Sequence, residues 1–224
     1  MNQISITVVV LPLSVFDANV SNGVLMKIAD MPKLESPFVR AVINGGYVVT
    51  PQIVEGYEWV FSDDKVKATE KLDGMNVSII IERGDMAAVF NRLNPIKLIT
   101  GDWRINEALV EAARKEHIPG SDGQHFGEVI GPAVNGNPYK LDRHIWLPLA
   151  YIHEHMAYKS WGKYPKTYEA VSKWFRDDIF SLFIRKRGGE IAFPEGVVFV
   201  HPDGRMAKLR RDMFDWWTGR GHGE

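Results

Sequence analysis

The sequence contains a lysine that could act as a nucleophile, Lys71 in Glu-Lys-Leu-Asp-Gly at residues 70–74. A lysine amine attacks phosphorus only when it is unprotonated, and a nearby metal ion or second cation favours that form. Gly74 has no side chain, so it would let a substrate phosphate approach the backbone closely. Taken alone, a lysine between Glu70 and Asp73 is more typical of a surface ion pair.

A second stretch, Phe126-Gly127-Glu128, places a carboxylate between two glycines, Gly127 and Gly131. We expect these glycines to leave open space around Glu128. A carboxylate in such a position can accept a hydrogen bond from a sugar hydroxyl. This stretch therefore predicts a contact to the sugar of a ligand.

The third stretch begins at Glu195, which precedes Gly196 and an apolar run expected to form a strand over residues 196–201. Magnesium and manganese prefer carboxylate oxygens as ligands. Glu195 is therefore a candidate metal ligand, and an acid at the edge of a sheet is the alternative.

The fourth stretch, residues 206–211, places Lys208 and Arg210 on one face of an expected strand, because side chains repeat every two residues. Two cations on one buried face are costly unless an anion lies against them. A triphosphate would serve as that anion, and a solvated edge strand is the alternative.

Together and in this order, the four stretches resemble motifs I, III, IV and V of the covalent nucleotidyltransferase superfamily, which contains polynucleotide ligases and mRNA capping enzymes. The finer resemblance is to ATP-dependent RNA ligases of the RNA ligase 2 type, since Asn76 fills the last place of Glu-Lys-x-Asp/His-Gly-x-Asn. Most DNA ligases have arginine there. Gly131-Pro132 after Glu128 looks like the same group, and Arg92 lies where the family has its motif Ia arginine.

The resemblance implies a role for each matched residue. Lys71 would take AMP from ATP as a phosphoramidate, Glu128 would hold the ribose, and Glu195 would bind a catalytic Mg²⁺ or Mn²⁺. Lys208 would contact the α-phosphate. Asn76 and Arg92 would line the nucleotide or the 5′-phosphate, and Glu70 would lie beside the adenine. The remaining matched residues would complete the motifs: Asp73, Gly74, Phe126, Gly127 and Gly196.

The chain departs from the family pattern at two positions. Met206 replaces the first lysine of motif V, and Arg210 is expected to compensate from the same strand face. The aromatic residue that stacks on adenine in the family would fall at Pro148. We therefore expect Trp146 to take that role, with a buried core tryptophan as the alternative.

The elements that must position these residues are mostly strands. Hydrophobic alternation and turn residues predict a hairpin around residues 44–46, further strands near 57–61, 67–69, 77–82 and 86–90, and a hairpin over 196–211. Apolar residues at helical spacing predict helices over 102–117 and 165–185. The apolar run 4–16 is expected to be a buried strand, since it is too short to span a bilayer.

This order predicts an α+β fold, and the resemblance implies an ATP-grasp-like nucleotidyltransferase domain of antiparallel sheets with flanking helices around an ATP cleft. We expect one domain over 1–224, with a β-rich extension at 1–64, a short tail at 212–224 and no appended OB-fold. His153 and His155 lie on either side of Glu154 in the sequence. On a strand, the two imidazoles would share one face, but no third metal ligand is in view.

Composition narrows the function classes. Lys plus Arg is 27 and Asp plus Glu is 28, which excludes a polybasic nucleic-acid coat but allows a local basic groove. The chain has no cysteine, so a thiolate metal site and a cysteine nucleophile are excluded. We expect a cytoplasmic monomer, without a membrane partner, that acts on RNA with 5′-phosphate and 3′-hydroxyl ends. A nicked duplex and an accessory RNA-binding partner remain open. The alternatives are a DNA ligase, a capping-type enzyme, or a non-catalytic nucleotide- or RNA-binding relative.

Overall fold

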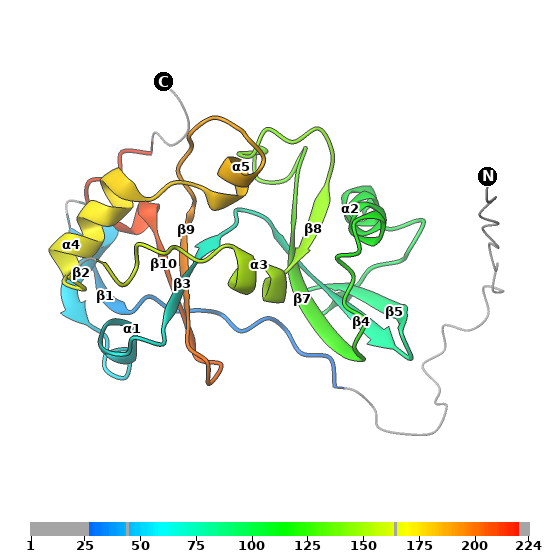
Figure 1. Ribbon diagram of the computed structural model, residues 1–224, viewed down its shortest axis with the longest axis horizontal. Helices are drawn as coiled ribbons and strands as arrows, with labels where there is room; N and C mark the ends of the chain where they lie inside the picture. The colour runs from blue at the N-terminus through cyan, green and yellow to red at the C-terminus, as the bar shows by residue number, and fades with distance from the viewer. Residues whose placement is uncertain (1–26, 44, 164, 220–224) are drawn as a thin grey trace.

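The computed structural model describes residues 27–43, 45–163 and 165–219 (Figure 1). Within these ranges the chain forms antiparallel sheets and short helices, which confirms the predicted α+β class. The strand predicted at 4–16 lies outside the described residues. Of the helices described, none has the length and apolar character needed to cross a bilayer.

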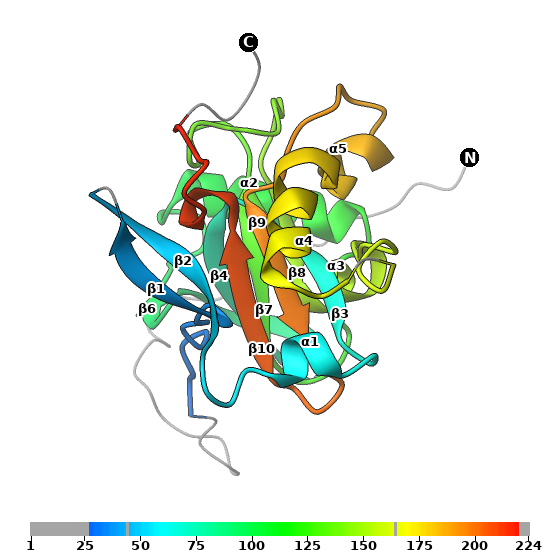
Figure 2. The same ribbon diagram turned by 90° about the vertical axis from the view of Figure 1, so that its left-hand side faces the viewer.

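A three-stranded sheet contains β3 (Lys67–Lys71), β9 (Gly196–Val200) and β10 (Met206–Arg210), with β9 in the middle. The predicted hairpin over 196–211 is confirmed, and its strands pair in antiparallel register. Figure 2 looks onto this side of the molecule and shows β9 and β10 together with α4.

A five-stranded sheet has the order β6-β5-β4-β7-β8. Its members are β4 (Met75–Glu82), β5 (Asp85–Asn91), β6 (Asn94–Pro95), β7 (Gly123–Ile130) and β8 (Ile145–Pro148). Because β3 belongs to the other sheet and β4 to this one, residues 72–74 carry the chain directly from one sheet to the other.

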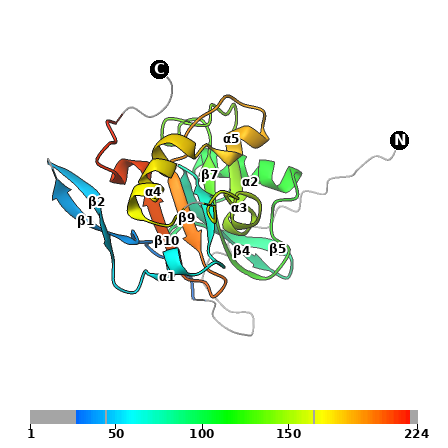
Figure 3. The same ribbon diagram turned by 60° about the vertical axis from the view of Figure 1, so that its left-hand side comes forward.

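The hairpin predicted near the N-terminal end is also present, as β1 (Phe38–Ile43) and β2 (Gly46–Ile53), and Figure 3 shows it standing out at the side. The strand predicted near residues 57–61 is wrong, since this segment contains the short helix α1 (Trp59–Ser62). Trp59 and Val60 are both buried, and a strand would send consecutive side chains to opposite faces.

The helix predicted over 102–117 is confirmed as α2 (Trp103–Arg114), with Asp102 as its N-cap. Its predicted apolar face is buried against the five-stranded sheet. The helix predicted over 165–185 is interrupted. The segment contains α4 (Tyr168–Lys173), the short π-helix η1 (Trp174–Asp178) and α5 (Leu182–Lys186). Trp174, Phe175 and Ile179 are all fully buried at these breaks, which a single regular stripe would not achieve.

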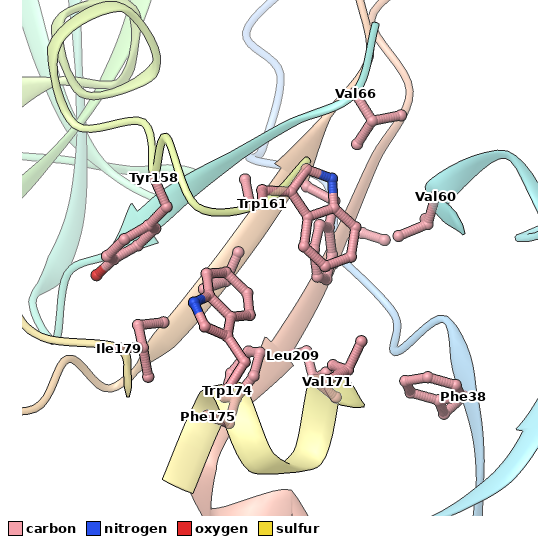
Figure 4. Close-up of a cluster of buried hydrophobic side chains, with 14 of the residues drawn as sticks. Phe38, Val60, Val66, Tyr158, Trp161, Val171, Trp174, Phe175, Ile179 and Leu209 are labelled. Atoms are coloured by element: carbon pink, nitrogen blue, oxygen red, sulfur yellow. The ribbon is translucent and has the colours of Figure 1, made fainter. Parts of the chain in front are cut away.

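The three-stranded and the five-stranded sheets have separate cores. One cluster packs behind the three-stranded sheet, where Trp161 lies close to Trp174 (Figure 4). Trp161 also packs against Phe199. A second lies between the five-stranded sheet and α2. A third joins β8 to α3 (Leu149–His155) and α5, and the short η2 (Arg211–Met213) follows β10. The two sheets are therefore separately supported walls.

Trp146 belongs to the core, so its predicted stacking on adenine is wrong. Its side chain is fully buried on β8, and its indole N–H donates to the carbonyl of Val77 at 3.0 Å. A side chain at Gly127 would collide with the indole ring. The space above Gly127 is thus filled by Trp146, so this glycine does not provide the open space that the sequence had suggested.

We expect Gly127→Ala to lower the free energy of unfolding by about 1–3 kcal/mol, because the added methyl group overpacks the contact with Trp146. Urea denaturation would measure the loss. Gly120→Ala is the control, since a Cβ there meets nothing within 4 Å. Equal stability of the two variants would contradict this packing role.

Candidate active site

A cleft of about 690 Å³ lies between the two sheets and brings together residues that are far apart in the sequence. Six of the predicted site residues line it, from β3, β4, β7, β10 and the turn after β5. They are Glu70, Lys71, Asn76, Arg92, Glu128 and Lys208. The remaining walls are formed by Leu72, Leu149, Ile152, His153, Val198, Met206 and residues 30–34.

The central contact is an ion pair between Lys71 and Glu195. Lys71 Nζ lies 2.6 Å from Glu195 Oε2, and both side chains are largely buried, with 23% and 19% of their surface exposed. The strand register produces this contact, because Lys71 at the end of β3 pairs with Gly196, the residue after Glu195. The amine and the carboxylate are therefore fixed by the backbone of one sheet.

Gly196 allows the same strand to carry a partner on its other side. Arg210 pairs with Gly196 from β10, and a side chain at Gly196 would lie only 2.7 Å from Arg210 Cα. Arg210 Nη1 consequently lies 3.6 Å from Glu195 Oε1. Arg210 lines a second cavity of about 260 Å³ with Glu195 and Asp73, whereas Lys208 lines the main cleft.

Glu128 and Asn76 face each other across β7 and β4. Within the described part of the chain, Glu128 Oε2 and Asn76 Oδ1 are buried without a hydrogen-bond partner. Burial raises the pKa of Glu128 to about 7, although the positive charge of Lys71 acts in the opposite direction. Unsatisfied polar atoms in a cleft are typical of positions that a ligand completes.

Gly74 and Gly131 have packing roles that differ from those predicted. A Cβ at Gly74 would lie 2.7 Å from the carbonyl oxygen of Val129 and 3.0 Å from Glu128 Oε2. At Gly131, which has a φ of +142°, it would meet the backbone of residues 143–144. These glycines therefore permit close approach of neighbouring chain and of the Glu128 carboxylate, and leave no open space for a phosphate.

Glu70 lines the cleft, but its carboxylate points to α5. It accepts hydrogen bonds from Ser181 Oγ at 2.6 Å and from the backbone N–H of Phe183 at 2.8 Å. Burial raises the pKa of Glu70 to about 7, and these hydrogen bonds partly oppose the rise. The side chain thus anchors a helix, and only the rest of the residue faces the cleft.

Asp73 fixes the turn that connects the sheets. Its Oδ1 accepts from Asn135 Nδ2 at 2.7 Å, and its backbone N–H donates to the hydroxyl of Tyr139 at 2.6 Å. Phe126 is half-buried on β7 and is not among the residues that line the cleft. Asp73 therefore lies beside the Lys71–Glu195 pair, on the side of the second cavity.

Two cations lie along the cleft at different depths. Burial and the nearby charges of Lys71 and Arg210 lower the pKa of Lys208, so an anion in the cleft would favour its charged form. Arg92 lies at the rim with 63% of its side chain exposed, and its Nη1 is 3.5 Å from Asp30 Oδ2.

The sequence analysis missed the wall formed by residues 30–34 and the contribution of α3. The first segment has no regular structure and no hydrophobic period, so no pattern could have placed it beside Asn76 and Lys208. Residues 153–155 lie in or at the end of helix α3, not on a strand, and His153 lines the cleft. A pKa lowered by burial favours the neutral form of His153.

Whether a metal ion could bind depends on the carboxylate and imidazole groups of the site. In the described residues, no group of three or more His, Asp or Glu side chains could hold one. Magnesium usually takes one or two protein carboxylates together with substrate phosphates and water. Glu195 lines the second cavity and lies beside the basic side chains of Lys71 and Arg210, so it fits that mode of binding.

Comparisons with known proteins give matches only among solved structures. No protein-family model matches the chain, and no curated protein matches it. Naegleria gruberi RNA ligase with PPi matches at 16% identity and a TM-score of 0.47, over 89% of this chain and 61% of that chain. An alanine variant of the same ligase with ATP and Mn matches at 13% identity and a TM-score of 0.45, over 79% and 59%. This chain thus covers about three-fifths of the neighbours' length.

Glu70 should make the stability of the protein depend on pH. Its pKa is about 7 in the folded protein and about 4.3 in an unfolded chain. Its contribution is therefore fully present below pH 4 and is lost as the pH rises through 7. We expect Glu70→Gln to gain about 1–3 kcal/mol relative to wild type between pH 5 and pH 8 in urea denaturation.

The control for this measurement is Glu82→Gln, at an exposed position of β4. Its stability should change with pH as the wild type does, because Glu70, Glu128 and Glu195 are unchanged in it. If Glu70→Gln also follows the wild-type curve, the carboxyl of Glu70 is not buried as described.

Proposed function

We propose that the chain is an ATP-dependent RNA ligase that joins 5′-phosphate and 3′-hydroxyl RNA ends through a lysyl-AMP intermediate. The observation that carries this proposal is the position of Lys71, which is held against Glu195 at a cleft that also contains Lys208, Arg92 and two unsatisfied oxygens. The resemblance of the four motifs in the sequence supports the same activity.

The cleft has the size and chemistry to hold a nucleotide. Its volume of about 690 Å³ lies within the range of small-molecule sites. The basic side chains would bind phosphates, while Glu128 and Asn76 would receive sugar hydroxyls. Leu149, Ile152 and Val198 supply apolar surface for a base, in place of the aromatic residue expected from the sequence.

In the first step, the unprotonated Nζ of Lys71 would attack the α-phosphorus of ATP. The N–P bond forms as the bond to the pyrophosphate oxygen breaks, and the lysine loses a proton. Glu195 lies 2.6 Å from Nζ and is placed to accept that proton. Lys208 would neutralise charge on the α-phosphate, since its strand lines the same cleft.

Glu195 would also hold Mg²⁺ or Mn²⁺ once a nucleotide supplies further oxygen ligands. A divalent cation neutralises charge on the transferring phosphate and favours the unprotonated amine nearby. In the second step, the 5′-phosphate of RNA displaces Lys71 from AMP. A 3′-hydroxyl then attacks the activated 5′ end, a phosphodiester bond forms and AMP leaves.

The wild-type protein should retain radiolabel after denaturation when incubated with α-labelled ATP and Mn²⁺, and Lys71→Ala should retain none, because the amine is the atom that forms the bond. Gel electrophoresis of the denatured protein would measure the label. Lys67→Ala, on the exposed side of the same strand, is the control and should label normally.

Labelling with different nucleotides and sealing of different ends separate the alternatives. Labelling from GTP instead of ATP would indicate a capping-type enzyme, and sealing of DNA but not RNA ends would indicate a DNA ligase. An unlabelled wild-type protein that still binds nucleotide would be a binding module, and the ligase proposal would be wrong.

Glu195→Ala should slow AMP transfer from the labelled protein to 5′-phosphorylated RNA by about 100-fold, because the divalent cation that would neutralise charge at the phosphate loses its carboxylate ligand. Rapid-mixing measurement of the label on RNA would test this. Glu190→Ala is the control, since its side chain is 92% exposed in the loop before Glu195. Unimpaired transfer by Glu195→Ala would refute the role given to this carboxylate.

A further inference from the structure

One segment without regular structure, residues 29–35, connects the two sheets across the cleft, and we call it the strap (Figure 1). At its start, the N–H of Ala29 donates to Gln124 Oε1 at 2.9 Å, and Gln124 Nε2 donates back to the Ala29 carbonyl at 2.8 Å. At its end, the carbonyl of Glu35 accepts from the backbone N–H of Lys208 at 2.9 Å. The first attachment is to β7 and the second to β10, so the strap is tied to both walls.

The middle of the strap leaves the cleft open and forms part of its surface. Residues 30–34 all line the cavity of about 690 Å³. Asp30 pairs with Arg92, and the thioether of Met31 accepts from Asn76 Nδ2 at 2.8 Å. A ligand in the cavity would therefore touch the strap on one side and the sheets on the other.

The strap contributes a basic side chain, Lys33, to the cleft. Lys71 gives up its charge when it acts as a nucleophile, and Arg92 is paired with Asp30. This leaves Lys208 and Lys33 among the basic residues that line the cavity. Lys33 has a weak partner, because Glu35 is 3.9 Å away and the Lys33 side chain is 86% exposed.

The neighbouring position on β10 makes this cation more important. Met206 and Lys208 lie on the same face of the strand, and both line the cleft. Met206 offers only a neutral thioether, so β10 contributes a single charge there. The strap is bonded to the same strand, at Lys208, through Glu35, and Lys33 two residues earlier lines the same cleft as Met206 and Lys208.

We propose that the strap is a wall of the nucleotide site and that Lys33 binds the terminal phosphates of the nucleoside triphosphate. This inference rests on the proposed function, and it assigns the polyphosphate contact to a residue outside the four motifs. Lys33 holds the part of ATP that leaves as pyrophosphate, whereas Lys208 and Lys71 act at the α-phosphate.

Binding of ATP and of AMP should separate this role from a structural one. We expect Lys33→Gln to weaken ATP binding about tenfold and to leave AMP binding unchanged, because AMP has no terminal phosphates. Isothermal titration calorimetry at one ionic strength would measure both. Lys27→Gln is the control, since it removes the same charge from an exposed residue before the strap.

A second variant tests the charge itself. Adding Met206→Lys to Lys33→Gln should restore most of the ATP affinity, because it places an ammonium group on the same side of the cleft. Equal weakening of ATP and AMP by Lys33→Gln, no weakening of ATP, or no rescue by Met206→Lys would each overturn the assignment to Lys33.

The proposed function can fail independently of this inference. Wild-type protein that binds no ATP and acquires no label would remove the ligase proposal and this one together. Wild-type protein that is labelled normally, with ATP affinity unchanged in Lys33→Gln, would remove only the role of Lys33.

Discussion

The molecule depends on a crossing between two sheets within residues 72–74. Lys71 is the last residue of β3 and Met75 is the first residue of β4, so the amine lies at the junction of two separately packed sheets. Leu72 is buried in the third core cluster, and Asp73 is hydrogen-bonded to Asn135 and to Tyr139. A partly buried charge needs a partner in fixed geometry, and the strand register provides Glu195. The Lys71 amine, which we propose as the nucleophile, is therefore held in place by the protein alone.

The electrostatics of the cleft differ from what a count of acidic residues would suggest. Burial raises the pKa of Glu70 and Glu128 to about 7 and also raises that of Glu195. The first two carboxyls are therefore partly protonated near neutral pH, which reduces the negative charge that a polyphosphate would meet. With Lys208 and Lys33 along the walls, the site favours an anion although the whole chain is almost neutral.

Local patterns predicted most of the described strands, and six of the residues singled out in the sequence line one cleft. Alternation in residues 196–211 placed Lys208 on the cleft side, and apolar spacing identified the buried face of α2. The failures come from tertiary contacts that no local pattern contains. Trp146 lies in the core because Gly127 across the sheet makes room for its ring, and the 165–185 helix breaks where adjacent bulky residues must all be buried. The strap was missed because it has no period and is held by hydrogen bonds to Gln124 and Lys208, which lie far away in the sequence.

The alternation of β10 limits how this sequence could vary. Ala207 and Leu209 are fully buried between the half-buried Met206, Lys208 and Arg210. A shift of one residue in the pairing of β10 with β9 would exchange the two sets and bring leucine into the cleft and lysine into the core. The loop between these strands should therefore tolerate substitutions far better than a single-residue insertion or deletion that propagates into the strand.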